Sequence, residues 1–175
     1  MKKQLYDISK NNSILGNAEF KIANFKRIGL HYDLVAERVY DVHRTCTDPF
    51  SQLFMWYIIA GLISFDMGRM MGKVEEAYDF EGKGFGSRLN LKLDKIRPNL
   101  DPLMSLSLAE ITLKKHKQDI LKAYRELSDD GEGALNKNGH FYVGATKILH
   151  FLNPELFIIV DSYATEAFQK THGVK

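Results

Sequence analysis

The sequence is poor in the residues that build covalent or metal-based frameworks. It has one cysteine, Cys46, and four prolines in 175 residues. A single cysteine excludes an intramolecular disulfide and a cysteine-based metal site, and it indicates a reducing compartment, so we predict a cytoplasmic protein. The six histidines show no HxxxH or HExxH spacing. The local sequence therefore predicts neither a metal site nor a cofactor.

Long hydrophobic runs are also missing. The most apolar stretch extends from Leu53 to Phe65, and it is shorter than the roughly 20 residues that a helix needs to cross a bilayer. The first seven residues contain Lys2, Lys3 and Asp7, where a signal peptide would need its apolar region. We therefore expect neither secretion nor a membrane partner, and a buried central helix explains the apolar stretch better.

An excess of charge of one sign is absent, because the net charge is only +2. The charges are nevertheless uneven. The stretches from Lys83 to Arg97 and from Lys114 to Arg125 each hold five bases and one acid, which makes each of them +4, and acidic stretches over 75–81 and 126–132 balance them. Such a distribution is typical of a polarised surface, but also of solvated helices separated by acidic loops.

Helical periodicity dominates what is present. It predicts an all-α fold, a compact bundle of six or seven helices around an apolar central helix at about 50–71, in a single domain over residues 1–175. The leucines of 89–93 alternate in a way that would equally fit a strand. It stays open whether the chain is truncated after Lys175. We predict helices over about 17–27, 32–45, 49–71, 87–97, 107–127, 143–153 and 162–172, and loops over 72–86 and 129–140.

Several side chains have the type and position of helix start signals. Asp48 followed by Pro49 predicts the start of the central helix,. Ser87 predicts a cap for the next helix, and Ser107 with Glu110 has the capping-box spacing,. Together these signals predict where three of the helices begin.

The segment from Tyr142 to Ser162 carries the first candidate site. A helix that opens at Gly144 presents free amides that can bind a phosphate oxygen, and Thr146 and Lys147 follow within one turn,. An apolar run then leads to Asp161 at the start of a further predicted helix. The alternative interpretation is structural: Gly144 makes a tight turn, Lys147 points to water and Asp161 caps the last helix.

The order Val143-Gly144-x-x-Lys147, an apolar helix and then Val160-Asp161-Ser162 resembles the helix-hairpin-helix DNA glycosylases over about residues 141–163. That resemblance implies that Gly144 belongs to a hairpin binding the DNA backbone, that Lys147 is a nucleophile and that Asp161 is its acid/base or electrostatic partner. The segment departs from the family in having His140-Phe141-Tyr142 where the hairpin normally starts with leucine, proline and glycine. The segment also resembles an uncharacterised bacterial protein family, which implies no function.

The glycine-rich stretch over 81–88 is the second candidate site. Its alternating glycines let the backbone approach a ligand closely, and Lys83, Ser87 and Arg88 could contact phosphates,. It lacks the spacing of a P-loop, so nucleotide hydrolysis is not supported. A flexible connector is the alternative.

Three functions follow from these features. The leading hypothesis is a DNA- or RNA-binding protein that contacts the phosphate backbone through Lys83, Ser87, Arg88, Lys92, Gly144 and Thr146. An enzymatic alternative is a DNA glycosylase or lyase using Lys147 and Asp161, which would form a borohydride-trappable Schiff base with abasic DNA. The third is a helical protein-protein interaction module with an apolar surface around Trp56 or the 67–71 segment. The sequence decides neither whether the protein is an enzyme nor its oligomeric state.

Overall fold

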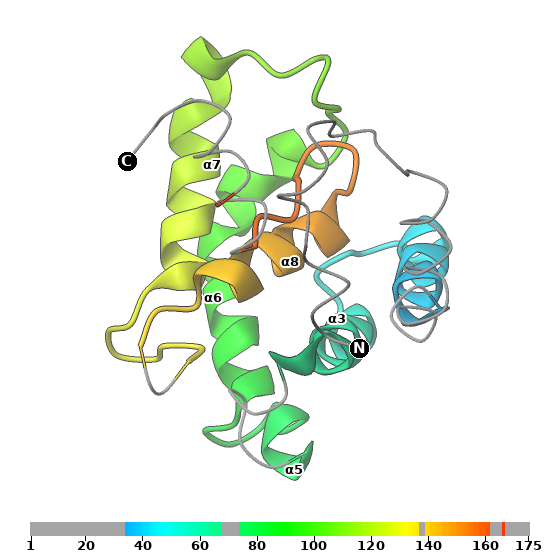
Figure 1. The fold of residues 1–175 in the computed structure, drawn as a ribbon, viewed down its shortest axis with the longest axis vertical. Helices are drawn as coiled ribbons and strands as arrows, with labels where there is room; N and C mark the ends of the chain where they lie inside the picture. Colours follow the sequence, from blue (N-terminus) through cyan, green and yellow to red (C-terminus); the bar gives the residue numbers. More distant parts are fainter. Residues whose placement is uncertain (1–33, 68–73, 137–138, 162–165, 167–175) are drawn as a thin grey trace, which may run out of the picture.

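The computed structural model describes residues 34–67, 74–136, 139–161 and 166. Helices dominate this part of the chain and no strand occurs in it, so the predicted all-α fold is confirmed (Figure 1). The predicted helices over 17–27 and 162–172 lie outside the described residues, apart from helical Glu166. In chain order the elements are a helix over 34–45, α3 (Gln52–Leu62), the π-helical η2 (Ile63–Met67), α5 (Val74–Ala77), α6 (Phe85–Leu100), the 3₁₀ turn η3 (Asp101–Leu103), α7 (Leu113–Ser128) and α8 (Tyr142–Leu152).

Helices α6 and α7 lie side by side and run in opposite directions (Figure 1). Two polar contacts give their register. Asn99 Nδ2 donates to Asp119 Oδ1 at 2.6 Å, and Lys92 Nζ donates to the carbonyl oxygen of Glu126 at 2.7 Å. Residue numbers that fall along α6 thus pair with residue numbers that rise along α7, as expected for two antiparallel helices. Helix α8 packs against α7 and also against α3, so it joins the α6–α7 pair to the rest of the bundle.

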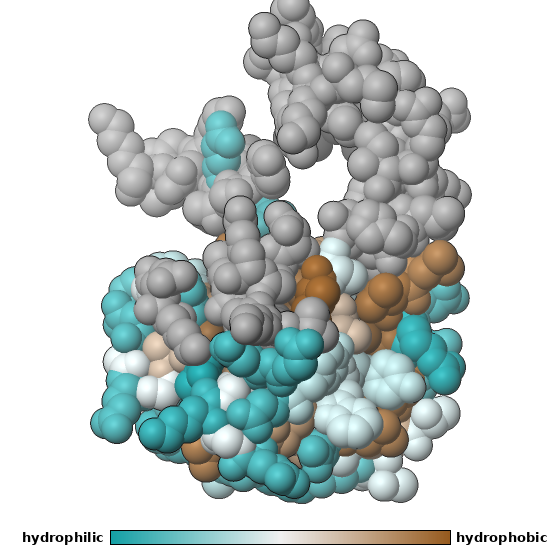
Figure 2. Space-filling model, turned by 90° about the horizontal axis from the view of Figure 1, so that it is seen from below, coloured by the Kyte–Doolittle hydropathy of each residue, from teal (hydrophilic) through white to brown (hydrophobic). Residues whose placement is uncertain are grey.

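One core of buried apolar side chains connects these helices. The rings of Phe85 in α6 and Phe141 before α8 meet edge to face, with centroids 5.8 Å apart, and both are fully buried or nearly so. Burying one such side chain contributes about 1.5–3 kcal/mol to folding. Seen from below, the described surface is mostly hydrophilic, and hydrophobic residues gather toward its right-hand side (Figure 2).

The apolar stretch after Pro49 forms a core helix, but one that buries only part of its circumference. Helix α3 buries the side chains of Phe54, Met55, Ile58, Ile59 and Leu62, whereas Leu53 and Trp56 are 56% and 47% exposed. The helix starts at Gln52 rather than at Pro49. Ser51 is its cap, because its Oγ accepts a hydrogen bond from Phe54 N, while Asp48 Oδ1 accepts from Phe50 N and holds the preceding turn.

The predicted limits of α6 are wrong at both ends. Gly84 occupies the cap position and the helix begins at Phe85, so Ser87 lies inside the first turn. The amide of Ser87 donates to the carbonyl oxygen of Asp79 at 2.7 Å. Pro98 does not end the helix, which continues to Leu100. Pro98 has no N–H to donate to the carbonyl oxygen of Asp94 one turn earlier, and α6 tolerates this loss,.

The Ser107–Glu110 pair before α7 makes only one of the two hydrogen bonds of a capping box, and it does not start the helix. Ser107 Oγ and Ser107 N both donate to Glu110 Oε2, at 2.7 and 2.8 Å, and they close a separate turn. Helix α7 begins later, at Leu113, after Thr112, whose amide donates to Nδ1 of the buried His116. A histidine one turn inside the helix therefore satisfies an amide at the start of α7, where a capping side chain would otherwise do so.

Candidate nucleic-acid interface

The structure places the segment that ends at Asp161 beside α8, the helix that carries Lys147. Lys147 lies in α8 and is 7% exposed, with Nζ 4.4 Å from the centroid of the Phe65 ring. Val160 N donates to Thr146 Oγ1, and Thr146 Oγ1 approaches the carbonyl oxygen of Val160, both at 3.2 Å. These contacts hold the segment before Asp161 against the start of α8. Because Lys147 is buried and its ammonium lies over the half-buried ring of Phe65, a Schiff base at Lys147 would require an opening toward the surface, and the lyase hypothesis stays a prediction.

Gly144 packs against an aromatic ring. A Cβ placed on Gly144 would lie 2.1 Å from two carbon atoms of the Phe141 ring, so the ring occupies the space beside this glycine. Gly144 itself is buried in the first turn of α8. Packing against Phe141 is therefore sufficient to explain why position 144 is a glycine, and this explanation does not depend on a ligand at the amides of the first turn.

The glycine-rich stretch folds around a carboxylate of the protein itself. Asp79 Oδ1 accepts hydrogen bonds from the amides of Glu81 and Gly82, and Oδ2 accepts one from Gly84. Successive amides of this kind form an anion-binding concavity. The hydrogen bond from Gly82, supported by the others, holds the pKa of Asp79 below its usual value. An external phosphate would have to displace this carboxylate to reach the same amides.

We expect Asp79→Asn to destabilise the protein at neutral pH and to do so less in acid. An asparagine would turn an amino group toward one of the three amides. Since the folded pKa of Asp79 is depressed, its stabilisation is present above the unfolded value of 3.8 and is lost as the pH falls through the lower folded pKa. Melting temperatures of both proteins between about pH 7 and pH 2.5 would test this. Asp94→Asn makes the same change at an exposed carboxylate without a backbone hydrogen bond and serves as the control. A constant difference for Asp79→Asn would contradict the assignment.

Lys83, Ser87 and Arg88 are brought together, as the walls of a groove of about 750 Å³ between the start of α6 and the loop after α7. Arg88 Nε and Nη2 are buried and make no hydrogen bond within the described part of the chain. Burial lowers the pKa of Arg88, and the charge of Glu76 opposes that effect. The facing wall carries Asp130 and Glu132. The groove therefore has donors for one small anion but repels a long polyanion.

The remaining bases of the first +4 stretch are paired. Lys92 is 5% exposed and lies 3.3 Å from Glu126 Oε1, and Lys95 lies 2.6 Å from Glu126 Oε2. Burial opposes ionisation of Glu126, but hydrogen bonds and charge from these two lysines outweigh it and lower its pKa. Arg97 Nη2 lies 3.1 Å from Asp48. Lys92 thus fastens α6 to α7, and its ammonium is directed into the protein.

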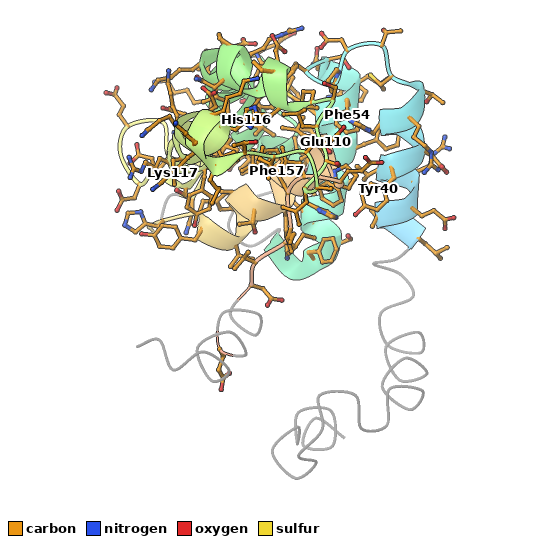
Figure 3. All side chains as sticks on the ribbon, turned by 90° about the horizontal axis from the view of Figure 1, so that it is seen from above. Tyr40, Phe54, Glu110, His116, Lys117 and Phe157 are labelled. Carbon is orange, nitrogen blue, oxygen red and sulfur yellow. The ribbon has the colours of Figure 1, made fainter. Side chains whose placement is uncertain are left out.

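The second +4 stretch is organised differently, as an exposed face of α7. Within the described chain, none of its five bases has an ion-pair partner. Its one acid, Asp119, accepts a hydrogen bond from Asn99. Figure 3 shows Lys117 toward the outside of the molecule and Phe157 toward its middle. We call Lys114, Lys115, Lys117, Lys122 and Arg125, all exposed, the basic face.

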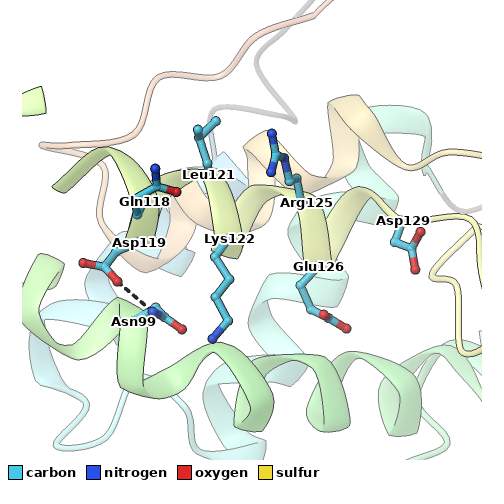
Figure 4. A pocket seen from close by; sticks show the side chains of 8 residues that line it. All are labelled: Asn99, Gln118, Asp119, Leu121, Lys122, Arg125, Glu126 and Asp129. Atoms are coloured by element: carbon cyan, nitrogen blue, oxygen red, sulfur yellow. Dashed lines mark hydrogen bonds between the residues drawn. The ribbon is translucent and has the colours of Figure 1, made fainter.

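A hollow of about 470 Å³ lies along this face, next to α6. Figure 4 shows Lys122 extending from α7 toward α6, whereas Leu121 and Arg125 point to the other side of the helix. The charge count along the sequence had already marked this stretch. None of its residues was among the predicted contacts, because the sequence did not show which of the two basic stretches keeps its charges unpaired.

The described residues contain neither a cluster of metal ligands nor a membrane-spanning helix. No group of three or more His, Cys, Asp or Glu side chains there could hold a metal ion. In the same residues no helix is both long and apolar enough to cross a membrane. No protein-family model, curated protein or solved structure matches this chain, so its function has to be inferred from the geometry alone.

Proposed function

We propose that the protein binds the phosphate backbone of nucleic acid through the basic face of α7. The observation that carries this proposal is the contrast between the two +4 stretches. The bases at Lys92, Lys95 and Arg97 have carboxylate partners, whereas those of α7 are exposed and have no such partner among the described residues. Unpaired bases at a regular spacing are what a repeating array of phosphates attracts.

The spacing of the basic face supports a linear contact. Lys114, Lys117 and Arg125 follow one another at intervals that return to one side of an α-helix, with Leu121 between them,. Lys115 and Lys122 form a second row beside the first. Two rows of charge along a helix of 16 residues can follow a backbone over several phosphates.

The basic face suits a polyanion better than the glycine-rich groove does. In the groove, Lys83 and Arg88 face Asp130 and Glu132, and the loop amides already hold the Asp79 carboxylate. The leading hypothesis from the sequence is thus kept in its general form, while the proposed contacts move to α7.

We expect Lys117→Gln with Lys122→Gln to weaken nucleic-acid binding and its dependence on salt. Removing one phosphate contact reduces the slope of log K against log salt by about 0.7 for a single strand and 0.9 for B-DNA. Fluorescence anisotropy with a labelled oligonucleotide, titrated at several salt concentrations, gives both affinity and slope.

The matched control is Lys83→Gln with Lys95→Gln, which removes the same charge from exposed positions on the α6 side. It should change the slope little. An equal loss for both pairs would contradict the assignment to α7, because only net charge would then matter. Absence of binding by the unmodified protein at low salt, to single- or double-stranded DNA or RNA, would exclude the proposed function.

A further inference from the structure

A row of nearly parallel aromatic rings borders the basic face. The rings of His140 and Tyr142 stack with centroids 4.6 Å apart and an angle of 18° between their planes. Tyr124 of α7 continues the row, 6.5 Å from Tyr142 at 15°. Tyr142 is 50% exposed. The row thus leads from the side of α7 out to solvent.

An apolar pocket of about 360 Å³ adjoins the same row. Tyr124 and Leu121 of α7 form one wall, and Leu149 of α8 with Phe157 forms another. Leu121 also lines the polar hollow on the α6 side of the helix, together with Lys122 and Arg125. Helix α7 therefore carries cationic groups next to a pocket with aromatic and aliphatic walls.

This juxtaposition matches the two parts of a nucleotide. A phosphate is attracted to the lysines and the arginine, while a base is flat, aromatic and only weakly polar on its faces. Proteins that bind single strands combine a basic track with aromatic side chains on which bases stack. In a duplex the bases are already stacked on one another, so only the phosphates and groove edges could reach this surface.

We infer that the nucleic acid bound by α7 is single-stranded, and that an unpaired base stacks on the exposed end of the row formed by His140, Tyr142 and Tyr124. This inference rests on the proposed function and names its substrate class. The basic face holds the backbone and supplies the salt dependence, whereas the aromatic row supplies a contribution that salt leaves unchanged.

Three probes of equal length test the inference with the full chain: a labelled oligo-dT, the same backbone with abasic residues in place of every base, and a duplex. The first two carry equal charge and differ only in the bases. We expect oligo-dT to bind at least about tenfold more tightly than the abasic strand, which is the range of one stacked base, and more tightly than the duplex. Equal binding of oligo-dT and the abasic strand would overturn the inference while leaving the proposed function intact.

Substitution of the exposed ring gives an independent measurement. Tyr142→Ala should lower the affinity for oligo-dT by about tenfold with an unchanged salt slope and an unchanged affinity for the abasic strand. Tyr142→Phe keeps the ring and should bind as the unmodified protein does. Circular dichroism melts establish that both variants are folded. A loss for Tyr142→Ala that is equal for both strands would overturn the base contact. Failure of the unmodified protein to bind any of the three probes, or RNA strands and duplexes of the same length, at low salt would overturn the inference together with the proposed function.

Discussion

Replacing Asn153 by aspartate should destabilise the protein more than any change to an exposed polar side chain. Asn153 is 4% exposed at the end of α8, and its Nδ2 donates to the carbonyl oxygens of Leu103 and Leu106, each at 2.8 Å. Its Oδ1 accepts from the amide of Glu155. One side chain therefore holds η3 and the segment after it against the end of α8.

Asn153→Ala would remove the side-chain donor from both carbonyl groups, of which Leu103 would keep only the amide of Leu106 at 3.2 Å, and we expect this to lower the free energy of unfolding by about 2–4 kcal/mol. Asn153→Asp should cost more at neutral pH, because a carboxylate would face two carbonyl oxygens in a buried site. Burial beside two carbonyl oxygens should raise the pKa of the introduced carboxyl group, so the variant should regain stability as the pH falls and lose it as the pH rises through the folded pKa.

Urea unfolding of both variants at about pH 7 and pH 4.5 would measure these differences. Gln118→Glu is the matched control, since it makes the same amide-to-acid change at an exposed position on α7 and should alter stability little. If Asn153→Asp were as stable as the unmodified protein at neutral pH, the hydrogen bonds to Leu103 and Leu106 could not be as described.

Gly144→Ala should have the second large effect, against the usual trend for helices. Alanine inside a helix is normally favoured over glycine by about 0.5–1 kcal/mol. Here the new Cβ would lie 2.1 Å from the ring of Phe141, which is 1% exposed and packs on Phe85. The ring would have to leave its position, and we expect a net loss of about 3 kcal/mol in the free energy of unfolding.

A double-mutant cycle with Phe141→Leu isolates the clash. Phe141→Leu alone removes ring contacts and should destabilise, but the two changes together should cost less than the sum of the single changes, because the smaller side chain makes room for the Cβ. Gly131→Ala serves as the control glycine, since its Cβ would meet only the end of the Asp129 side chain, at 3.0 Å. Stabilisation by Gly144→Ala would contradict the packing.

The local sequence pattern was sufficient to predict that most of the helices form, but it was not sufficient to predict the residues at which they begin. The periodicity of the 32–45 and 143–153 segments and the apolar stretch after Pro49 predicted helices that the structure contains. Asp48 and the Ser107–Glu110 pair were predicted to begin helices, but they close short turns before them. A side chain that accepts an amide hydrogen bond stabilises a turn whether or not a helix follows, so the signal cannot distinguish the two cases.

The roles of the charged residues could not be predicted because they depend on tertiary pairing. Lys92 and Glu126 are far apart in sequence, and only the antiparallel packing of α6 on α7 makes them partners. The same packing leaves the lysines at the start of α7 exposed. Likewise, the glycines of 81–88 have the composition of a phosphate loop, yet Asp79, which lies outside that stretch, supplies the anion. Composition indicated a basic surface and an anion-binding loop, but it did not show that a carboxylate of the protein itself already accepts the hydrogen bonds of that loop.

The beginning of α7 has an energetic consequence for the unbound protein. Its first residues include Lys114, Lys115 and Lys117, with no acidic side chain in the first turn and no side-chain cap on Thr112. The helix dipole makes that end partially positive, so each lysine there opposes its own helix, by about 0.3–1 kcal/mol where a cation sits at the unfavourable terminus. An anion bound at this end would relieve both the dipole and the mutual repulsion of the lysines. Electrostatic repulsion therefore destabilises α7 in the free protein, and a bound polyanion should make this helix more resistant to unfolding.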